Sequence, residues 1–178
     1  MSDSEEKVVL VDKNGNSIGT EYKLKAHRDG LRHRAFSLMI YRKTEGSVQY
    51  LLQKRAASKY HGGGLWSNTC CSHPRPDEAL MVAVHRRLNE ELGVRSGAPI
   101  MELAPVLYKV TMANGLVEHE YDHVFVCEDD FDVVNPDPNE VSECQWVTHT
   151  SLEESLEAYP ERFTPWLPIV LNQLRGKL

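Results

Sequence analysis

The chain has 178 residues, of which 41% are hydrophobic and 26% charged, and its formal net charge is −6 at pH 7. This length and composition predict a single water-soluble domain with a substantial core. Acidic and basic residues are interspersed, so no basic stripe indicates nucleic-acid binding, and no apolar run reaches membrane-spanning length. We therefore expect a small-molecule substrate.

The N-terminal residues and the cysteines indicate a cellular compartment. Residues 1–7 are acidic and polar, unlike a secretory signal peptide. The four cysteines occur without secretory features, and two of them are adjacent, so we interpret them as reduced thiols. These features predict a cytoplasmic protein.

Strands dominate the middle of the chain, and helices are interleaved later. A first strand at residues 8–11 is followed by a turn at 12–15, and two strands at 34–41 and 48–54 are separated by a turn at 44–47. Strands at 105–112 and 116–127 flank Asn114-Gly115, which is a strong hairpin signal.

The strongest predicted helix covers residues 77–92. Asp77 is its expected N-cap, and Gly93 suits the position just after its end. Its apolar residues recur every fourth position at Leu80, Val84 and Leu88.

Two further helices are expected near the C-terminus. Ser151-x-x-Glu154 predicts a capping box that opens a helix over 151–159. Thr164 and Pro165 predict the next helix start, with threonine as N-cap and proline at the first position. Together the elements predict an α+β class, with a mixed β-sheet packed between α-helices in a single domain.

Residues 78–94 carry a pattern beyond amphipathicity, which resembles the Nudix box Gly-x5-Glu-x7-Arg-Glu-U-x-Glu-Glu-x-Gly-U, where U is bulky and aliphatic. The matching residues are Glu78, Arg86, Leu88, Glu90, Glu91, Gly93 and Val94. In that family the helix carboxylates hold a divalent metal against a diphosphate, as suits hard magnesium. The alternative is a solvated helix with Arg86–Glu90 and Arg87–Glu91 pairs.

Two positions depart from the box. Ser72 replaces its first glycine, and Arg87 replaces the glutamate that follows the arginine. A cation at position 87 removes a metal ligand, which disfavours hydrolysis and favours a site that holds a diphosphate without cleaving it.

Residues 68–74 place Cys71 two residues before His73, between polar neighbours. A lone cysteine is usually a small buried hydrophobe. The polar surroundings favour a chemical role here, and nearby cations would favour its thiolate.

Glu118 and Glu120 lie in a strand-like run, so both side chains point to one face while His119 points to the other. With His27, His33 and His73 they would make a metal site of three nitrogens and two carboxylates, if the fold gathers them. The remaining histidines are interpreted as ordinary surface or core residues: His61, His85, His119, His123 and His149. Arg55 and Lys59 are either surface cations or an anion site.

Several blocks in order resemble the type 1 isopentenyl diphosphate isomerase family, the Nudix-fold branch. They are residues 31–37, 55–59, 66–74, 91–94, 118–120 and 164–166. The matches run from about residue 27 to 166, the expected catalytic core of one domain over 1–178. The resemblance implies an enzyme that interconverts isopentenyl and dimethylallyl diphosphate in isoprenoid synthesis, through protonation, a tertiary carbocation and deprotonation.

The resemblance also implies roles for individual residues. It implies catalysis by Cys71, Glu120, Tyr108 and Trp166, with Trp166 as an aromatic lid. It implies substrate-facing cations at Lys23, Arg55, Lys59 and Arg87. It implies ligands of a protein-bound divalent metal (Mn²⁺, Zn²⁺ or Mg²⁺) at His27, His33, His73, Glu118 and Glu120, and a contact from Glu91 to a Mg²⁺ that arrives with the diphosphate. The spacing from His27 to His33 is one residue shorter than in some members of the family.

Two other functions stay open. A Nudix diphosphohydrolase is favoured by Glu90-Glu91 and opposed by Arg87 and the Cys71/His73 block. A non-catalytic zinc- or diphosphate-binding module would use Cys71, His73 and His33 structurally, but closely paired zinc ligands are missing. We expect no nucleic-acid or membrane partner, and a monomer or weak homodimer.

Overall fold

The structure, a computed structural model, describes residues 6–131 and 134–178, so residues 1–5 of the acidic N-terminal segment lie outside it. Within the described residues, ten strands share one sheet and four α-helices accompany it. The strands are β1 (Lys7–Val11), β2 (Ser17–Tyr22), β3 (His33–Thr44), β4 (Ser47–Arg55), β5 (Trp66–Ser67), β6 (Cys70–Ser72), β7 (Ile100–Glu102), β8 (Val106–Thr111), β9 (Val117–Glu128) and β10 (Val141–Thr148). The helices are α1 (Lys23–Asp29), α2 (Leu80–Leu92), α3 (His149–Ala158), the short 3-10 helix η1 (Pro160–Arg162) and α4 (Leu167–Leu174).

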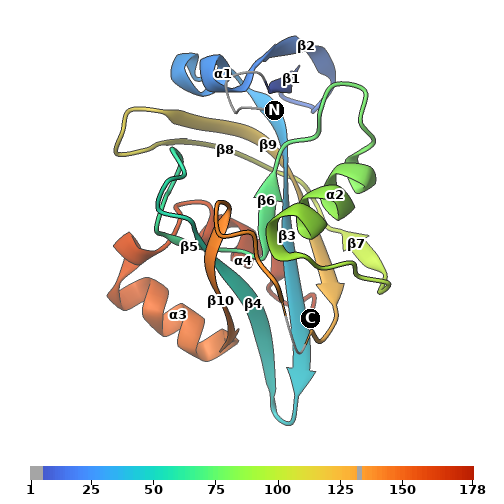
Figure 1. Ribbon diagram of the computed structural model, residues 1–178, viewed down its shortest axis with the longest axis vertical. Helices are drawn as coiled ribbons and strands as arrows, with labels where there is room; N and C mark the ends of the chain where they lie inside the picture. The colour runs from blue at the N-terminus through green and yellow to red at the C-terminus, as the bar shows by residue number, and fades with distance from the viewer. Residues whose placement is uncertain (1–5, 132–133) are drawn as a thin grey trace.

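Strand β3 runs through the centre of the sheet (Figure 1). It pairs antiparallel with β4 and β6 and parallel with β9. Strand β10 extends the sheet beyond β4, and β7 and β8 both pair with β9. The sheet is therefore mixed, as predicted.

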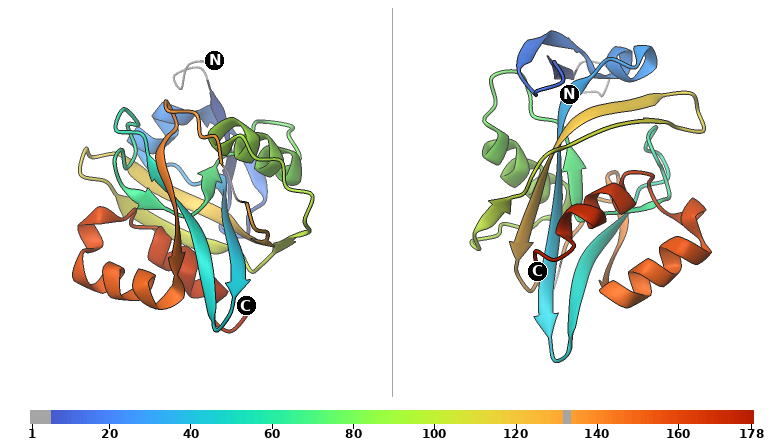
Figure 2. Two further views of the ribbon diagram at one scale, coloured as in Figure 1. Left: turned by 60° about the horizontal axis from the view of Figure 1, so that its bottom comes forward. Right: turned by 180° about the vertical axis from the view of Figure 1, so that it is seen from behind.

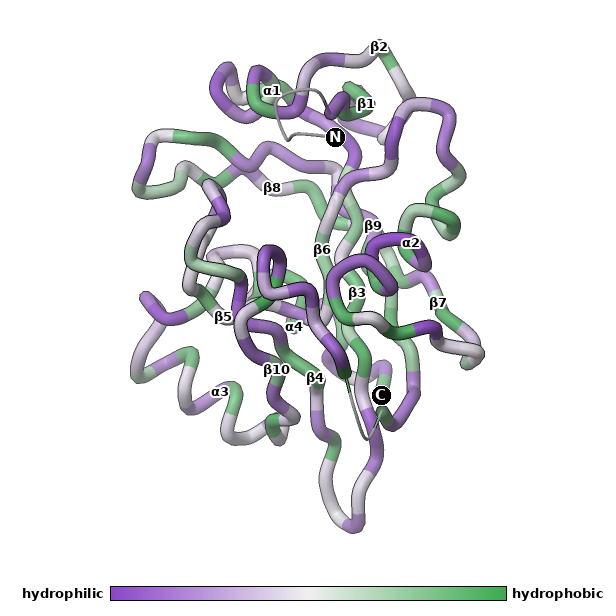
Figure 3. Tube along the Cα trace, in the orientation of Figure 1, coloured by the Kyte–Doolittle hydropathy of each residue, from purple (hydrophilic) through white to green (hydrophobic). Residues whose placement is uncertain are grey.

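Helices cover both faces of the sheet because β3 presents apolar side chains alternately to each side. Leu38 and Ile40 pack with α2 on one face, whereas Met39 and Tyr41 pack with α3 and α4 on the other. The view from behind shows α4 lying across that second face (Figure 2). In Figure 3 the central strands are green where they pass between these layers, and the β3–β4 tip is hydrophilic. The predicted α+β layering is confirmed.

The local signals located the strands and hairpins well. Each predicted strand overlaps an observed one, and the Asn-Gly turn joins β8 to β9. Gly115 has φ 82°, a left-handed conformation in which glycine is unstrained. Gly93 ends α2 with φ 67°, as predicted. A Cβ there would lie 2.7 Å from the carbonyl oxygen of Asn135.

The predicted start of the long helix is wrong. Helix α2 begins at Leu80 with Ala79 as N-cap, and Asp77 adopts φ 64° in the preceding turn. Glu78 accepts a hydrogen bond from the backbone N–H of Arg75, so this turn has a side-chain partner of its own. The local turn therefore takes the place of the first predicted helical turn.

The starts of the two C-terminal helices also differ from the prediction. Thr148, not Ser151, caps α3, and its hydroxyl accepts from the backbone N–H of Ser151. Helix α4 begins at Leu167, and Thr164 is not its cap: the Thr164 hydroxyl donates to Ser67 Oγ over 3.2 Å, and its backbone N–H donates to the carbonyl of Trp66 over 2.8 Å. These contacts place Trp166 beside β5. Within the described residues, no helix has the length and apolarity needed to cross a bilayer.

Candidate active site

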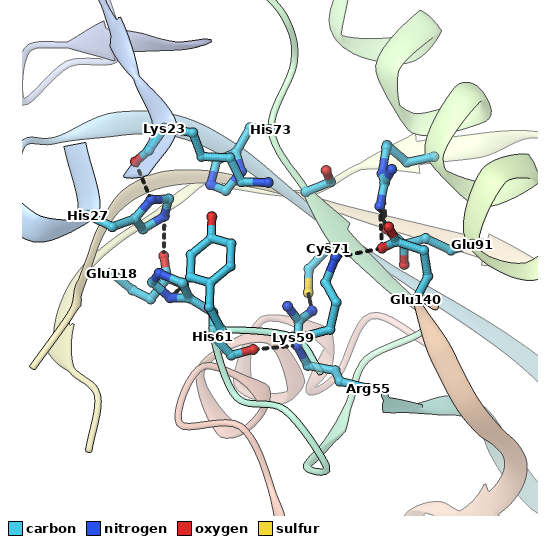
Figure 4. A pocket seen from close by; sticks show the side chains of 13 residues that line it. Lys23, His27, Arg55, Lys59, His61, Cys71, His73, Glu91, Glu118 and Glu140 are labelled. Atoms are coloured by element: carbon cyan, nitrogen blue, oxygen red, sulfur yellow. Dashed lines mark hydrogen bonds and ion pairs between the residues drawn. The ribbon is translucent and has the colours of Figure 1, made fainter. Parts of the chain in front are cut away.

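Two adjoining cavities open beside β6, β9 and the loop after β4. They share Arg55, Cys71, Ser72, His73 and Glu118. The first is further lined by Lys23, His27, Lys59, Tyr60, His61, Arg87, Glu91 and Glu140, and the second by Tyr108, Glu120 and Trp166. Every residue predicted for the site, except the fully buried His33, therefore lines one continuous region. Figure 4 shows the side chains that line the first cavity.

The strand register explains how distant residues meet. On β9, Glu118 and Glu120 point to one buried face, and the alternation directs His119 toward the carbonyl of Gly30. His33 begins β3 directly opposite Glu120 in the parallel pair. His73 follows β6, which pairs with β3.

The five predicted metal ligands form one cluster. Their ligand atoms, from His27, His33, His73, Glu118 and Glu120, all lie within 4.8 Å of one another. The Nε2 atoms of His33 and His73 are 3.2 Å apart, and His73 Nε2 is 2.9 Å from Glu120 Oε1. His27, despite its shortened spacing, belongs to the group because α1 places it beside Glu118.

Backbone carbonyls orient two of these imidazoles. His27 Nδ1 is 2.6 Å from the carbonyl of Lys23, and His33 Nδ1 is 2.8 Å from that of Leu31. A proton on each Nδ1 leaves Nε2 with its lone pair toward the cluster, the arrangement usual for metal-binding histidines. Glu118 Oε2 and His27 Nε2 are 3.1 Å apart but lack hydrogen-bond geometry, so both buried atoms have no hydrogen bond. The donor set and these two atoms fit a divalent ion.

The electrostatics favour the metal-binding forms of His73 and of both carboxylates. For His33, burial lowers the pKa, but the contact with Glu120 outweighs burial and raises it. Burial lowers the pKa of His73 to about 4, which keeps that imidazole neutral. Burial opposes ionisation of Glu118, yet His27 and His61 hold its pKa well below the usual value. Burial and the charge of Glu118 also oppose ionisation of Glu120, but its contacts with His33 and His73 leave its pKa lowered.

Cys71 and Glu120 both line the second cavity. Tyr108 donates a hydrogen bond of 2.5 Å to Glu120 Oε2 from the opposite position on β8. Arg55 Nη1 lies 3.6 Å from the sulfur of Cys71. Burial nevertheless raises the pKa of the Cys71 thiol to about 12, and Arg55 opposes only part of that shift. This shift favours the protonated thiol over the expected thiolate.

Trp166 closes the second cavity. Its side chain is 4% exposed, and its indole N–H donates to Ser67 Oγ over 3.1 Å. Arg55 Cζ lies 5.7 Å from the ring centroid. The indole is thus fixed on its polar side while the ring lines the cavity.

The four predicted substrate cations all line the first cavity, and three of them lie close to acidic side chains. Lys23 Nζ is 3.0 Å from Glu6, and Lys59 Nζ is 2.8 Å from Glu140. Arg87 Nη2 lies 2.8 Å from Glu91 and 2.9 Å from Glu140.

The surface pairs predicted for α2 are also present. Arg86 lies 3.1 Å from Glu90, and its main partner is Glu78 at 2.7 Å. The Arg87–Glu91 pair exists as well, but it lies in the cavity and not on a solvated surface.

Sequence reasoning missed several residues of the site. His61, interpreted as ordinary, is 4% exposed and contacts Glu118. Glu140 bridges two cations, and Gln53 donates to Glu91 Oε2 over 2.8 Å. Ser67 holds Trp166. Only the position of Ser67 beside the 68–74 block and of His61 beside Gly62–Gly64 hinted at them.

Comparison with known proteins agrees with this geometry. Residues 31–167 match the NUDIX domain family. The chain is 44% identical over 174 residues to the isopentenyl-diphosphate Delta-isomerase of Photobacterium profundum, covering 98% of this chain and 97% of that protein. It is 47% identical over 161 residues to the protein of that name from Cereibacter sphaeroides, covering 88% of each.

Solved structures agree on the fold. DR0079 from Deinococcus radiodurans superposes with a TM-score of 0.72 at 17% identity, covering 94% of this chain and 98% of that one. The NUDIX domain of NrtR from Shewanella oneidensis, in complex with ADP ribose, superposes with a TM-score of 0.63 at 16% identity, covering 80% of this chain and 86% of that one. At these identities the likeness concerns the fold alone. The near-full-length match at 44% identity shows that this chain, built on the Nudix fold, belongs to the isopentenyl-diphosphate Delta-isomerase family.

Proposed function

We propose that this protein interconverts isopentenyl diphosphate and dimethylallyl diphosphate in isoprenoid biosynthesis. The observation that carries the proposal is one cavity lined by a thiol, a carboxyl group and an indole, next to a second cavity lined by four cations. Relatives at 44% identity that are named for this reaction support it.

The reaction needs one proton added at C4 of the substrate and another removed from C2. In our proposal Cys71 and Glu120 are the two proton-transferring residues, since both line the cavity that Trp166 closes. Tyr108 donates to Glu120 and positions its carboxyl group. The reaction is reversible, so acid and base exchange roles with its direction.

The tertiary carbocation formed on protonation must be stabilised without being trapped by water. We assign this role to Trp166, because an indole face attracts a cation but offers no nucleophilic lone pair. Its burial and its hydrogen bond to Ser67 support the role, since they hold the ring in place.

The diphosphate would bind in the cation-lined cavity. Lys23, Arg55, Lys59 and Arg87 supply its positive charge, and guanidinium groups suit phosphate geometry. Glu140 pairs with Lys59 and Arg87, so we expect it to keep both cations in place before the substrate competes for them.

The chemistry of the donor atoms supports two divalent ions. His27, His33, His73, Glu118 and Glu120 would hold one, for which Mn²⁺, Zn²⁺ and Mg²⁺ are the candidates. Glu91 would contact Mg²⁺ that arrives with the diphosphate. When bound, these ions supply positive charge that tunes the carboxyl group of Glu120 and neutralises the diphosphate.

One assay tests the function. The protein is incubated with isopentenyl diphosphate and Mg²⁺, and dimethylallyl diphosphate and free phosphate are measured together. We expect dimethylallyl diphosphate without phosphate release, and none from Cys71→Ser. Phosphate as the main product would overturn the proposal in favour of a diphosphohydrolase.

We also propose a cytoplasmic location and a monomeric or weakly dimeric state. Four free cysteines, including the adjacent Cys70 and Cys71, support a reducing compartment. Cell fractionation tests the location, and sedimentation at several protein concentrations tests the oligomeric state.

A further inference from the structure

His61 occupies an unusual place beside the cluster of ligands. It lies in the loop between β4 and β5 and is 4% exposed. Its Nδ1 is 2.5 Å from Glu118 Oε1. The other carboxylate oxygen, Oε2, is the one nearest His27 Nε2, at 3.1 Å. The two oxygens of Glu118 therefore face different histidines, as the dashed lines in Figure 4 show.

The contact between His61 and Glu118 is close but not fully aligned. Neither ring nitrogen of His61 has a hydrogen bond of good geometry, and Glu118 Oε2 has none either. These three atoms are buried polar groups, which cost free energy unless a partner satisfies them. A small turn of the carboxylate, with Oε2 taken up by a cation, would align Oε1 with Nδ1–H.

The loop holds His61 firmly at this point. Arg55 Nε donates to the carbonyl of His61 over 2.9 Å, and Asn114 Nδ2 donates to the carbonyl of Tyr60 over 2.6 Å. Within the loop, Gly63 allows close backbone contact, because a Cβ there would lie 2.5 Å from the carbonyl oxygen of Lys59. The position of His61 is thus set by main-chain contacts from two sides.

Neighbouring rings set the orientation of the imidazole as well. Its centroid is 4.2 Å from that of His27 and 4.5 Å from that of Tyr60, both in edge-to-face geometry. A ring packed between two others has little freedom to turn away from Glu118.

Three of the other four candidate ligands have comparable outer partners. His27 and His33 are oriented by the carbonyls of Lys23 and Leu31, and Glu120 accepts a hydrogen bond from Tyr108. Such partners fix the orientation of metal ligands, and their removal commonly lowers metal affinity by about 10- to 100-fold. For Glu118, the corresponding outer partner is His61.

We propose that His61 is a positioning residue of the metal site, which holds Glu118 Oε1 through Nδ1–H so that Oε2 is presented to the ion. The inference rests on the metal-binding role in the proposed function, but it does not depend on which reaction the protein catalyses. A neutral imidazole carries one N–H, and placing it on Nδ1 satisfies the carboxylate without adding charge to the site.

Arg55 links the main chain at His61 to the thiol of Cys71. Arg55 donates to the carbonyl of His61 through Nε and approaches the sulfur of Cys71 through Nη1. Because this contact uses the main chain, a change of the His61 side chain removes the support of Glu118 while leaving the Arg55 contact available. Side-chain variants therefore test the positioning role by itself.

The test uses the full-length chain and three variants. His61→Ala removes the ring, and His61→Asn keeps an N–H donor near the place of Nδ1. His85→Ala is the control, since His85 is exposed on α2, away from both cavities. Each protein is loaded with Mn²⁺ or Zn²⁺ alone and titrated with a competing chelator, and its melting temperature is measured with and without metal.

We expect metal affinity to fall about tenfold or more in His61→Ala, in keeping with lost support of a ligand. His61→Asn should recover part of that loss, and His85→Ala should match the wild type. The rise in melting temperature on adding metal should shrink in the same order, because binding stabilises the folded state by mass action.

Several results would overturn the inference. One is an unchanged metal affinity in both His61 variants. Another is a metal-free variant that melts below the metal-free wild type but gains the same rise in melting temperature on adding metal, because His61 would then contribute only packing. Equal losses in His61→Ala and His61→Asn would also exclude the hydrogen bond. Wild-type protein that binds neither ion refutes the positioning role, whereas the product assay with isopentenyl diphosphate judges the proposed function separately.

Discussion

In the proposed function Arg87 is the residue of α2 that distinguishes an isomerase site from a hydrolase site, so its replacement gives the most informative prediction. Its guanidinium lies within 2.9 Å of both Glu91 and Glu140 and lines the cation-rich cavity. In Arg87→Gln the side chain keeps a polar amide but loses its charge. We expect the KM for isopentenyl diphosphate to rise because the variant loses one charge-assisted contact to the diphosphate.

The size of the effect follows from that contact. A hydrogen bond to a charged group contributes roughly 1.5–3 kcal/mol, which corresponds to about 10- to 150-fold in affinity. Arg87 must share its charge with Glu91 and Glu140 even when substrate is bound. We therefore expect the lower end, a KM increase of about tenfold. The kcat should change less, because the contact is to the diphosphate and not to the reacting carbons.

Stability must be separated from binding. Glu91 is 3% exposed, and it loses its cation in Arg87→Gln, although Gln53 still donates to it. Breaking a buried ion pair typically lowers the free energy of unfolding by roughly 3–5 kcal/mol. Because Gln53 remains, we expect a smaller decrease of about 2 kcal/mol, which corresponds to a melting temperature lower by roughly 4–8 °C for a chain of this size. Arg86→Gln is the matched control, because Arg86 pairs with Glu78 and Glu90 and does not line the cavity.

The assay measures isomerisation and phosphate release in wild type, Arg87→Gln, Arg86→Gln and Arg87→Glu. Arg87→Glu restores the hydrolase pattern of the helix, but it places a third carboxylate beside Glu91 and Glu140. We expect a still higher KM and no phosphate release. A wild-type KM in folded Arg87→Gln, or the same increase in Arg86→Gln, would refute the reasoning and leave Arg87 as a structural partner of Glu91.

The remaining predictions concern the thiol, the metal and the long helix. Cys71→Ser should lower turnover by orders of magnitude with the fold intact, since a hydroxyl is a far weaker acid than a thiol. Cys70 lies in the apolar core, so Cys70→Ser should mainly lower stability. Equal turnover in wild type and Cys71→Ser would exclude the thiol from the mechanism. Chelation should abolish activity, and readdition of metal should restore it and raise the melting temperature. Metal analysis of the purified protein should find about one tightly held divalent ion per chain, and a fully active metal-free preparation would contradict this. Hydrogen bonds from Arg86 lower the pKa of Glu78 in the folded protein, so its contribution to stability is present above the unfolded value near 4.5 and is lost as pH falls through the lower folded value. Glu78→Gln should therefore melt below the wild type at pH 7, by about 1 kcal/mol or less, and should match it at a pH below both values; a gap that is independent of pH would show that the charge is unimportant.

Local chemistry was readable from the sequence wherever a residue acts on its near neighbours. The alternation on β9 predicted that Glu118 and Glu120 share a face, and Gly93 and Gly115 marked a helix end and a hairpin. The block at residues 68–74 and the arginine at position 87 predicted the chemistry of the site because both depend on residue type and short spacing. These features depend on backbone geometry over a few residues, which the sequence encodes directly.

Helix starts were predicted less well because tertiary contacts compete with local caps. Thr164 is suitable as an N-cap, but its hydroxyl donates to Ser67, which is remote in sequence, and α4 begins only at Leu167. Asp77 is likewise taken into a turn with a left-handed conformation. In both places a long-range or turn contact outweighs a capping preference of about 1 kcal/mol.

The sequence named five candidate metal ligands but could not show that they lie together. The parallel pairing of β3 with β9 sets His33 opposite Glu120, and α1 delivers His27 to Glu118. Only the folded chain could also identify His61 and Glu140, whose partners Glu118 and Arg87 are remote in sequence. The raised pKa of Cys71 could likewise not be predicted from the sequence, since it depends on burial by residues that are remote in the chain. Residue type and spacing determined which chemistry was possible, whereas strand register and burial, which arise only on folding, decided which groups meet and in what charge state.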